Sequence, residues 1–236
     1  IIPCRILQEI YNKITIKLKK NIHINDIFCM YSGSSVGSII ISALLIKDDS
    51  NNPKYSINDI IDIMIKKCPD IFSSSCCNTF TSLYGLLSPR YTDNREDIFN
   101  QIFGKYLFKN LLSNVVFPAY DTLSDEPVYL NNTDINYGNL YVKDILLGCT
   151  AAPGYFNSKE LLVNEQKLNL VDSGCVVNNP DLLCYEIAKN SKKCDEKDIY
   201  VLSLGTGYCK DNEETIGWGF LNWLPSITSD LIELNS

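Results

Sequence analysis

Residues 27–40 read "IFCMYSGSSVGSII", and this stretch places a Gly-x-Ser-x-Gly motif between two regular elements. Its first six residues form a short apolar run of the kind that is buried on both faces of a parallel sheet. From Ser35 to Lys47 the apolar side chains recur at helical spacing. A strand, a tight turn and a helix in this order predict that Ser35 is exposed on the turn, as a nucleophilic serine would be.

The turn makes specific demands on the residues around Ser35. It crowds the positions two before and two after the serine, so Gly33 and Gly37 are both expected to be needed for their small size. The helix that follows begins at the serine, where its dipole and free backbone N–H groups, including that of Val36, favour a developing oxyanion. The motif alone is weak, because a glycine-lined strand–helix connection without any chemistry would look the same.

A serine nucleophile needs a base, and the order Ser, then Asp or Glu, then His is excluded here. The single histidine, His23, precedes Ser35 by twelve residues and is expected to be a structural or loop residue. The base must then be a carboxylate or a lysine, and a carboxylate would need burial and a direct hydrogen bond to the serine Oγ. Asp172 is the best candidate, because it ends the apolar run "LNLV" and precedes a turn at Ser173-Gly174. The alternative is an ordinary structural Asp-x-Gly turn.

The rest of the chain alternates between helical and strand-like patterns. Helical spacing is found at 4–14, 58–67, 95–103, 142–149 and 180–190, and strand-like runs at 115–121, 127–132, 167–174 and 198–207. This alternation predicts an α/β layered fold with a largely parallel sheet. Reactive groups gather at the carboxyl ends of strands in such sheets, and Ser35, Asp172 and the loop at Gly205 all fall at predicted strand ends.

Composition narrows the possible partners. The chain has 236 residues, 45% of them hydrophobic, and a net charge of −7, which argues against nucleic acid. The lysine-rich stretch 16–20 is expected to be solvated, although it could touch lipid headgroups. No apolar run reaches the roughly 18–20 residues that span a bilayer. Ten cysteines with no CxxC and one histidine do not suit a zinc site, so reduced and mostly buried thiols are expected, including Cys29, Cys149 and Cys184.

The sequences "GSSVG" (33–37) and "VDSG" (171–174) together resemble the two motifs of the patatin-like phospholipase family. Other stretches resemble landmarks of that family and occur in the family's order over nearly the whole chain: "IIPCRILQEI" (1–10), "VVFPAYD" (115–121), "CTAAPGYF" (149–156) and "SLGTG" (203–207). The resemblance implies a three-layer α/β/α fold with a largely parallel central sheet, formed by 1–236 as a single domain. It also implies hydrolysis of acyl esters in phospholipids or related glycerolipids, with Ser35 as nucleophile and Asp172 as base.

The chain departs from the family pattern in three places. Ser173 stands where the family has the first glycine of its Asp-Gly-Gly or Asp-Gly-Ala motif, while Gly174 is kept; a serine is tolerable there if its φ is negative. Ser38 replaces a third glycine after the nucleophile. The family's glycine-rich oxyanion loop precedes the segment that here begins at Ile1, so we expect an N-terminally truncated fragment, with the C-terminus a second candidate for truncation.

The resemblance implies no metal and no other cofactor, a lipid substrate and a transient contact with a membrane surface. A cytoplasmic or peripherally membrane-associated protein is favoured, and the oligomeric state is open. Two alternatives remain at this point. One is a non-catalytic binding, scaffold or storage protein that keeps the fold, and the other is an acyltransferase or thioesterase that uses the same two residues.

Overall fold

Strand β2 (Asn114–Asp121) is the strand to which most of the sheet is attached. The structure is a computed structural model that describes residues 1–20, 22–71, 94–191 and 195–207. In this part of the chain β2 pairs with β1 (Met30–Ser32), β3 (Glu126–Asn131) and β5 (Gln166–Asp172), and β4 (Lys159–Val163) pairs with β5. The β1–β2 pair is parallel, and the other three pairs are antiparallel.

The direction of β1 and β5 along β2 brings their carboxyl ends together. β3 pairs with Val116–Asp121 of β2, so β5, which pairs with 119–121, must take the opposite edge. Just beyond the end of β3, the N–H of Val115 donates to the Asn132 side chain and the C=O of Val115 accepts the Asn132 N–H. The β3 edge of β2 is therefore occupied at Val115 as well, so β1 pairs with the other edge of β2, which is also the edge of β5. β1 runs parallel to β2 and ends opposite Val116, whereas β5 runs antiparallel and ends opposite Ala119. The two strand ends therefore meet only three β2 residues apart, about 10 Å along the strand.

The described sheet is mixed, whereas a largely parallel one is expected from the sequence, and short hairpin turns account for two of its three antiparallel pairs. The β4–β5 turn consists of two residues, Asn164 (φ 48°) and Glu165 (φ 66°), both left-handed as in a type I′ turn. The β2–β3 turn is also short, and Asp121 accepts hydrogen bonds from the backbone N–H groups of Leu123 and Ser124 within it. Turns of this length can join only antiparallel neighbours.

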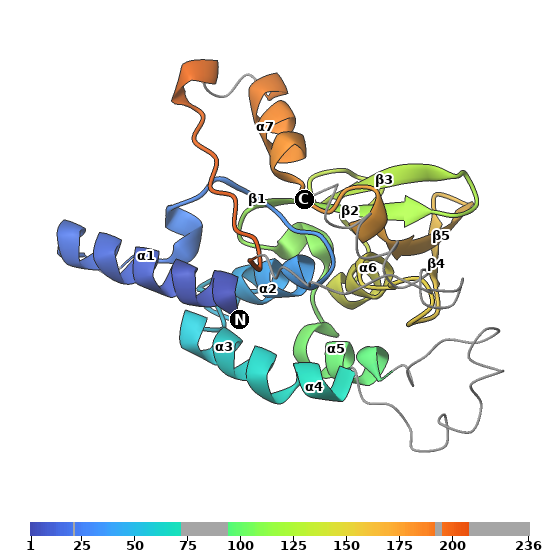
Figure 1. Ribbon diagram of the computed structural model, residues 1–236, viewed down its shortest axis with the longest axis horizontal. Helices are drawn as coiled ribbons and strands as arrows, with labels where there is room; N and C mark the ends of the chain where they lie inside the picture. The colour runs from blue at the N-terminus through green and yellow to red at the C-terminus, as the bar shows by residue number, and fades with distance from the viewer. Residues whose placement is uncertain (21, 72–93, 192–194, 208–236) are drawn as a thin grey trace, which may run out of the picture.

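Helices lie on both sides of these strands (Figure 1). Helix α2 (Val36–Leu45) packs on β1, and α6 (Val142–Cys149) packs on β2 and β5 and against α2. Helix α7 (Asp181–Asn190) contacts β1 and lies across the strands from α2 and α6. The predicted α/β class with helical layers around a sheet is therefore confirmed.

The remaining helices extend the layer that contains α2. Helix α3 packs against α2 and α1, and α5 packs against α6. Their bounds are α1 (Ile2–Leu18), α3 (Ile57–Lys66), α4 (Cys68–Ile71) and α5 (Arg95–Phe103), with short 3-10 helices at Ile24–Asp26, Phe108–Asn110, Ser173–Cys175 and Glu196–Asp198. Helices and strands share one cluster of buried apolar side chains, which includes Phe99, Phe103, Phe108 and Phe117. No described helix has both the length and the apolar character that a bilayer crossing requires.

Two expectations from the sequence need correction, and one strand of the structure has no counterpart among the expectations. The buried strand predicted at 198–207 is wrong for this structure, because residues 199–207 pair with no described strand and Tyr200 is 90% exposed. Cys29 is exposed, not buried, whereas Cys149 is buried and Cys184 half-buried. Strand β4 was not predicted, since its five residues carry no clear alternation.

Candidate active site

Ser35 sits on a strained turn between β1 and α2. Its backbone has φ 46° and ψ −121°, which is unusual for a residue with a side chain and is typical of a nucleophile elbow. The turn is held by two backbone hydrogen bonds: the N–H of Gly37 donates to the carbonyl of Ser34 (2.8 Å), and that of Ser38 donates to the carbonyl of Ser35 (3.0 Å). The Ser38 hydroxyl donates to the same Ser35 carbonyl at 2.6 Å. The sequence motif and the backbone geometry therefore agree at this position.

The two glycines of the motif differ in what they contribute. A Cβ atom on Gly33 would lie 2.6 Å from the carbonyl carbon of Gly37 and 2.8 Å from its oxygen, so only glycine fits there. A Cβ atom on Gly37 would meet no described atom within 4 Å. The prediction that both positions must be small is thus correct for Gly33 and wrong for Gly37 in the described part of the chain.

Asp172 lies at the end of β5 and faces Ser35. The residue is 7% exposed, its Oδ1 accepts the N–H of Gly174 at 2.9 Å, and the Ser35 hydroxyl is near enough to lower the pKa of the carboxyl. The N–H of Asp172 donates to the carbonyl of Ala151 at 3.0 Å, which ties the end of β5 to the segment that follows α6. Burial raises the pKa of the Asp172 carboxyl above its ordinary value, against the lowering effects of the Ser35 hydroxyl, the Gly174 N–H and the Arg95 charge.

Hydroxyl groups connect the turn of Ser35 with the turn of Asp172. The Ser34 hydroxyl donates to the carbonyl of Asn178 at 2.5 Å. The Ser173 side chain is fully buried and its hydroxyl lies 3.2 Å from the carbonyl of Pro118 on β2 and 3.3 Å from that of Val177. Ser173 is not among the residues with positive φ, so the condition set for a serine at this position is met.

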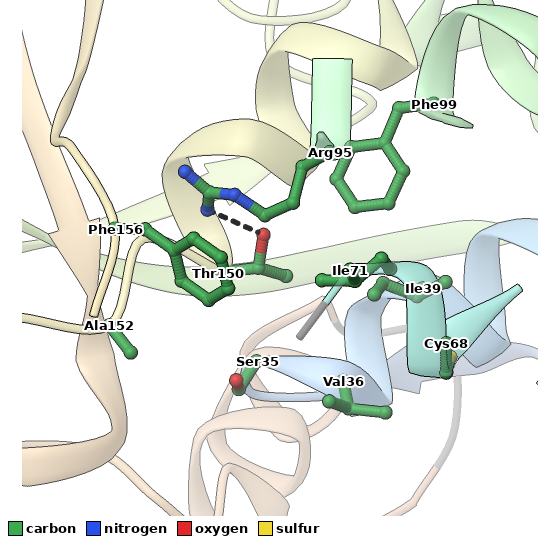
Figure 2. Close-up of a pocket in the computed structure, with 10 residues that line it drawn as sticks. All are labelled: Ser35, Val36, Ile39, Cys68, Ile71, Arg95, Phe99, Thr150, Ala152 and Phe156. Carbon is green, nitrogen blue, oxygen red and sulfur yellow. Dashed lines mark hydrogen bonds between the residues drawn. The ribbon is translucent and has the colours of Figure 1, made fainter. Parts of the chain in front are cut away.

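An apolar pocket opens beside Ser35 (Figure 2). Its lining includes side chains from α2, α4 and α5 and from the segment after α6: Ser35, Val36, Ile39, Cys68, Ile71, Arg95, Phe99, Thr150, Ala152 and Phe156. Figure 2 shows Ser35 and Val36 at one side of the pocket, with Arg95 and Phe156 across from them. Apart from the Ser35 and Thr150 hydroxyls and the Arg95 guanidinium, the named side chains carry no strongly polar group.

Arg95 is a buried charged residue at the pocket that sequence reasoning missed. It is 2% exposed, although it stands beside Glu96 and Asp97 in a pattern that is typical of a solvated helix start. Its position at a helical spacing of four from Phe99 was the available signal, because the two share the buried face of α5. By contrast, His23 is exposed at the start of a 3-10 helix, where its N–H donates to Asp26, and it is not a lining residue of the pocket.

The start of α2 leaves one backbone N–H beside Ser35 without an acceptor among the described residues. Among the hydrogen bonds of the described residues, none uses the N–H of Val36, the first residue of the helix after Ser35. Donors at a helix N-terminus point along the axis and carry its partial positive charge.

One family model matches most of the chain. The sequence model of patatin-like phospholipases matches residues 2–183. The chain belongs to the patatin-like phospholipase family. The predicted family is therefore confirmed, and members of this family are typically lipid acyl hydrolases.

The similar patatin-like proteins are distant in sequence. Patatin-like protein 1 of Arabidopsis thaliana is 26% identical over 84% of this chain, and Patatin-like protein 2 of the same plant is 28% identical over 84%. The chain spans 55% and 56% of the length of these two relatives. A third relative from that plant, 23% identical over 78% of the chain, is named "Probable inactive patatin-like protein 9".

Proposed function

We propose that this patatin-like protein is a serine lipid acyl hydrolase that cleaves acyl esters of phospholipids or related glycerolipids. Ser35 is the nucleophile and Asp172 the base. The observation that carries the proposal is that Ser35, on a strained turn, and the buried Asp172 carboxyl lie close enough for the Ser35 hydroxyl to act on the pKa of that carboxyl. A carboxylate has to be buried and in direct contact with the hydroxyl to serve as its base without a histidine.

The first half of the reaction acylates the serine. The Ser35 Oγ attacks the ester carbonyl carbon while its proton passes to Asp172, and the carbonyl oxygen becomes an oxyanion. The N–H of Val36 at the start of α2 donates to that oxyanion. When the oxyanion collapses, the bond to the alcohol oxygen breaks, and the leaving lysolipid takes the proton from Asp172.

Water reverses these roles in the second half. A water oxygen attacks the acyl carbon of the ester on Ser35 while Asp172 takes a proton from that water molecule. The tetrahedral intermediate then releases the fatty acid, and the proton returns from Asp172 to Ser35 Oγ. The raised pKa of the Asp172 carboxyl supports both halves, because a stronger base accepts the proton more readily.

The apolar pocket is small, and we assign to it only the first carbons of the acyl chain beside the ester. Ile39, Ile71 and Phe99 present only hydrocarbon to it, and Phe156 closes the side across from Ser35. Moving an acyl chain from water into such a lining is favourable by about 0.8 kcal/mol for each buried methylene. We propose a transient contact with the lipid surface from which the substrate is taken.

The non-catalytic alternative has one specific observation in its favour, since a similar protein is named as probably inactive. A binding or storage protein would keep the pocket without turnover. An acyltransferase or thioesterase would form the same ester on Ser35, and would differ in the acyl donor or in the acceptor that replaces water.

Hydrolysis of phosphatidylcholine in mixed micelles separates these functions. We expect fatty acid release by the protein and at least a 10³-fold lower rate in Ser35→Ala. Ser42→Ala is the matched control, because Ser42 lies in the same helix, is buried, and has a hydroxyl with no hydrogen-bond partner in the described structure. Equal rates in Ser35→Ala and Ser42→Ala would rule out Ser35 as nucleophile, and no release from any ester lipid would favour the binding protein.

A further inference from the structure

We propose that Arg95 is the positioning residue of Asp172: its guanidinium holds the segment to which the Asp172 backbone is anchored, and its charge favours the ionised carboxylate. This inference deepens the proposed function and rests on it for the role of Asp172 as base. Nothing in the two motifs of the family resemblance includes Arg95, which lies on α5 and far from both in sequence.

Arg95 and Asp172 are both charged and buried, and burying a charge is unfavourable unless an opposite charge lies nearby. Among the described residues, the buried charged side chains are Arg95, Asp121 and Asp172. A buried guanidinium without a buried anion nearby is strongly unfavourable. Asp121 is held elsewhere, because its oxygens accept the backbone N–H of Asn169 on β5 and those of Leu123 and Ser124 in the β2–β3 turn. Asp172 is a buried anion whose carboxyl is affected by the charge of Arg95.

The guanidinium also organises the chain that supports Asp172. Its Nη1 donates to the carbonyl of Leu147 (3.2 Å) and to the Thr150 hydroxyl (3.1 Å), and its Nη2 donates to the carbonyl of Asn157 (3.3 Å). The Arg95–Thr150 bond is drawn in Figure 2. These acceptors bracket the segment 150–157, so one side chain fixes both ends of it.

The fixed segment reaches Asp172 directly. The carbonyl of Ala151, inside the segment, accepts the N–H of Asp172 at 3.0 Å. The guanidinium carbon of Arg95 lies 4.1 Å from the centre of the Phe156 ring, so the planar group also stacks on the far end of the segment. A lysine could supply the charge but neither the fork of donors nor this stacking.

The groups that surround the Asp172 carboxyl come from three elements and one turn. The N–H of Gly174 donates to it, and the Ser35 hydroxyl at the start of α2 and the charge of Arg95 on α5 both lower its pKa. Cys149 on α6 is close enough to feel its charge, and burial raises the pKa of that thiol, so it stays neutral. Arg95 is thus the full charge that opposes the effect of burial, which otherwise favours the protonated and inactive carboxyl.

Two substitutions separate charge from support. Arg95→Gln removes the charge and keeps some donors, whereas Arg95→Lys keeps the charge and loses the fork. In a ¹³C-NMR titration of the Asp172 carboxyl, assigned with Asp172→Asn, we expect Arg95→Gln to titrate about 0.5–1 pH unit higher than the wild type and Arg95→Lys to titrate close to it. The acid limb of the kcat/KM profile for a soluble p-nitrophenyl ester should move with the titration. Arg95→Lys should lower kcat by about 10–100-fold with its acid limb in place.

Arg5→Gln is the matched control, since Arg5 is exposed on α1 and bonds to Gln8. An Asp172 titration in Arg95→Gln that coincides with those of the wild type and the control would overturn the inference. The titration needs no turnover, so it decides the role of Arg95 even if the wild type hydrolyses nothing, an outcome that would contradict the proposed function alone.

A double-variant cycle covers the case in which Arg95→Gln folds poorly. At about pH 8, where Asp172 is ionised, we expect Arg95→Gln to lower the melting temperature of the wild type more than that of Asp172→Asn. An equal lowering in both backgrounds would show that the two side chains are not coupled, and would also overturn the inference.

Discussion

Opposing effects act on the pKa of the Asp172 carboxyl, and their net direction predicts how activity depends on pH. Burial raises the pKa of the carboxyl, and the Ser35 hydroxyl, the hydrogen bond from Gly174 and the charge of Arg95 lower it, with a net upward direction. Only the ionised carboxylate accepts the serine proton, so activity must fall as pH drops through the raised pKa. We expect the acid limb of kcat/KM above the ordinary aspartate value of about 3.9. A profile that stays flat down to about pH 4 would contradict a buried carboxylate base.

The same upward direction makes Asp172 unfavourable for stability at neutral pH. A group with a raised folded pKa binds more protons in the folded state, so stability falls as pH rises from its unfolded pKa through its folded pKa. Asp172→Asn cannot ionise and lacks this pH dependence, although it also removes the anion near the buried Arg95. We expect the melting temperature of the wild type to fall relative to that of Asp172→Asn between about pH 4 and pH 7, and hydrolysis to be lost in the variant. A difference between the two melting temperatures that stays constant over this pH range would contradict the raised pKa of the Asp172 carboxyl.

The sequence predicts the two candidate catalytic residues, Ser35 and Asp172, but it does not predict the buried Arg95 near them. Ser35 could be found because its turn needs a recognisable motif, and Asp172 because the missing histidine directs the search to a carboxylate at a strand end. Arg95 could not be identified in the same way, since a single arginine beside two acidic residues resembles a solvated helix start. Its burial depends on contacts with α6 and the segment after it, more than fifty residues away in the chain.

In the turn from β1 to α2, the two glycines of the motif are in different surroundings. Gly33 is required by the close approach of the Gly37 backbone, while Gly37 itself sits in the first turn of α2 with open space where a Cβ would be. The motif does not distinguish these situations, because both positions are glycine in it.

Alanine at each position gives a matched pair of variants. We expect Gly33→Ala to lower the unfolding free energy by roughly 1–3 kcal/mol and to abolish hydrolysis, because the turn must shift. Gly37→Ala should be neutral or stabilising by up to about 1 kcal/mol, since alanine is the better helix former. Urea denaturation and an ester assay measure both effects. Similar losses in the two variants would contradict the unequal roles assigned to the glycines.

The hairpin β4–β5 is an element that the sequence concealed. Its strand β5 was predicted from the apolar run that leads to Asp172, but β4 lacked a signal of its own. The left-handed pair Asn164 and Glu165 was not recognised as a turn, because glutamate seldom takes the position that glycine usually fills.

In the molecule as a whole, pairing with β2 determines how close Ser35 after β1 and Asp172 at the end of β5 lie to each other. β1 and β5 end three residues apart on the same edge of β2, one arriving parallel and the other antiparallel. The expected convergence of strand ends is therefore found, but it comes from a mixed sheet. The direction of a strand depends on pairing with distant parts of the chain, which the periodicity of a sequence does not contain. The apolar run at 198–207 shows the same limit, because its pattern is strand-like but residues 199–207 pair with no described strand.

A core substitution in β2 should test this central role. Phe117 is fully buried and its ring lies 5.7 Å from that of Phe108. We expect Phe117→Ala to lower the unfolding free energy by about 3–5 kcal/mol in urea denaturation. Tyr129→Ala on β3, where the side chain is 42% exposed, should lower it by less than about 1 kcal/mol. Equal effects would show that the β2 core is not the main support of the site.

The central claim is that Ser35 is a nucleophile activated by Asp172, and labelling with a fluorophosphonate followed by intact-mass analysis tests it most directly. The account predicts one adduct on the wild type and on Ser42→Ala, none on Ser35→Ala, and much slower labelling of Asp172→Asn. An adduct that persists in Ser35→Ala, or labelling of Asp172→Asn at the wild-type rate, would contradict it.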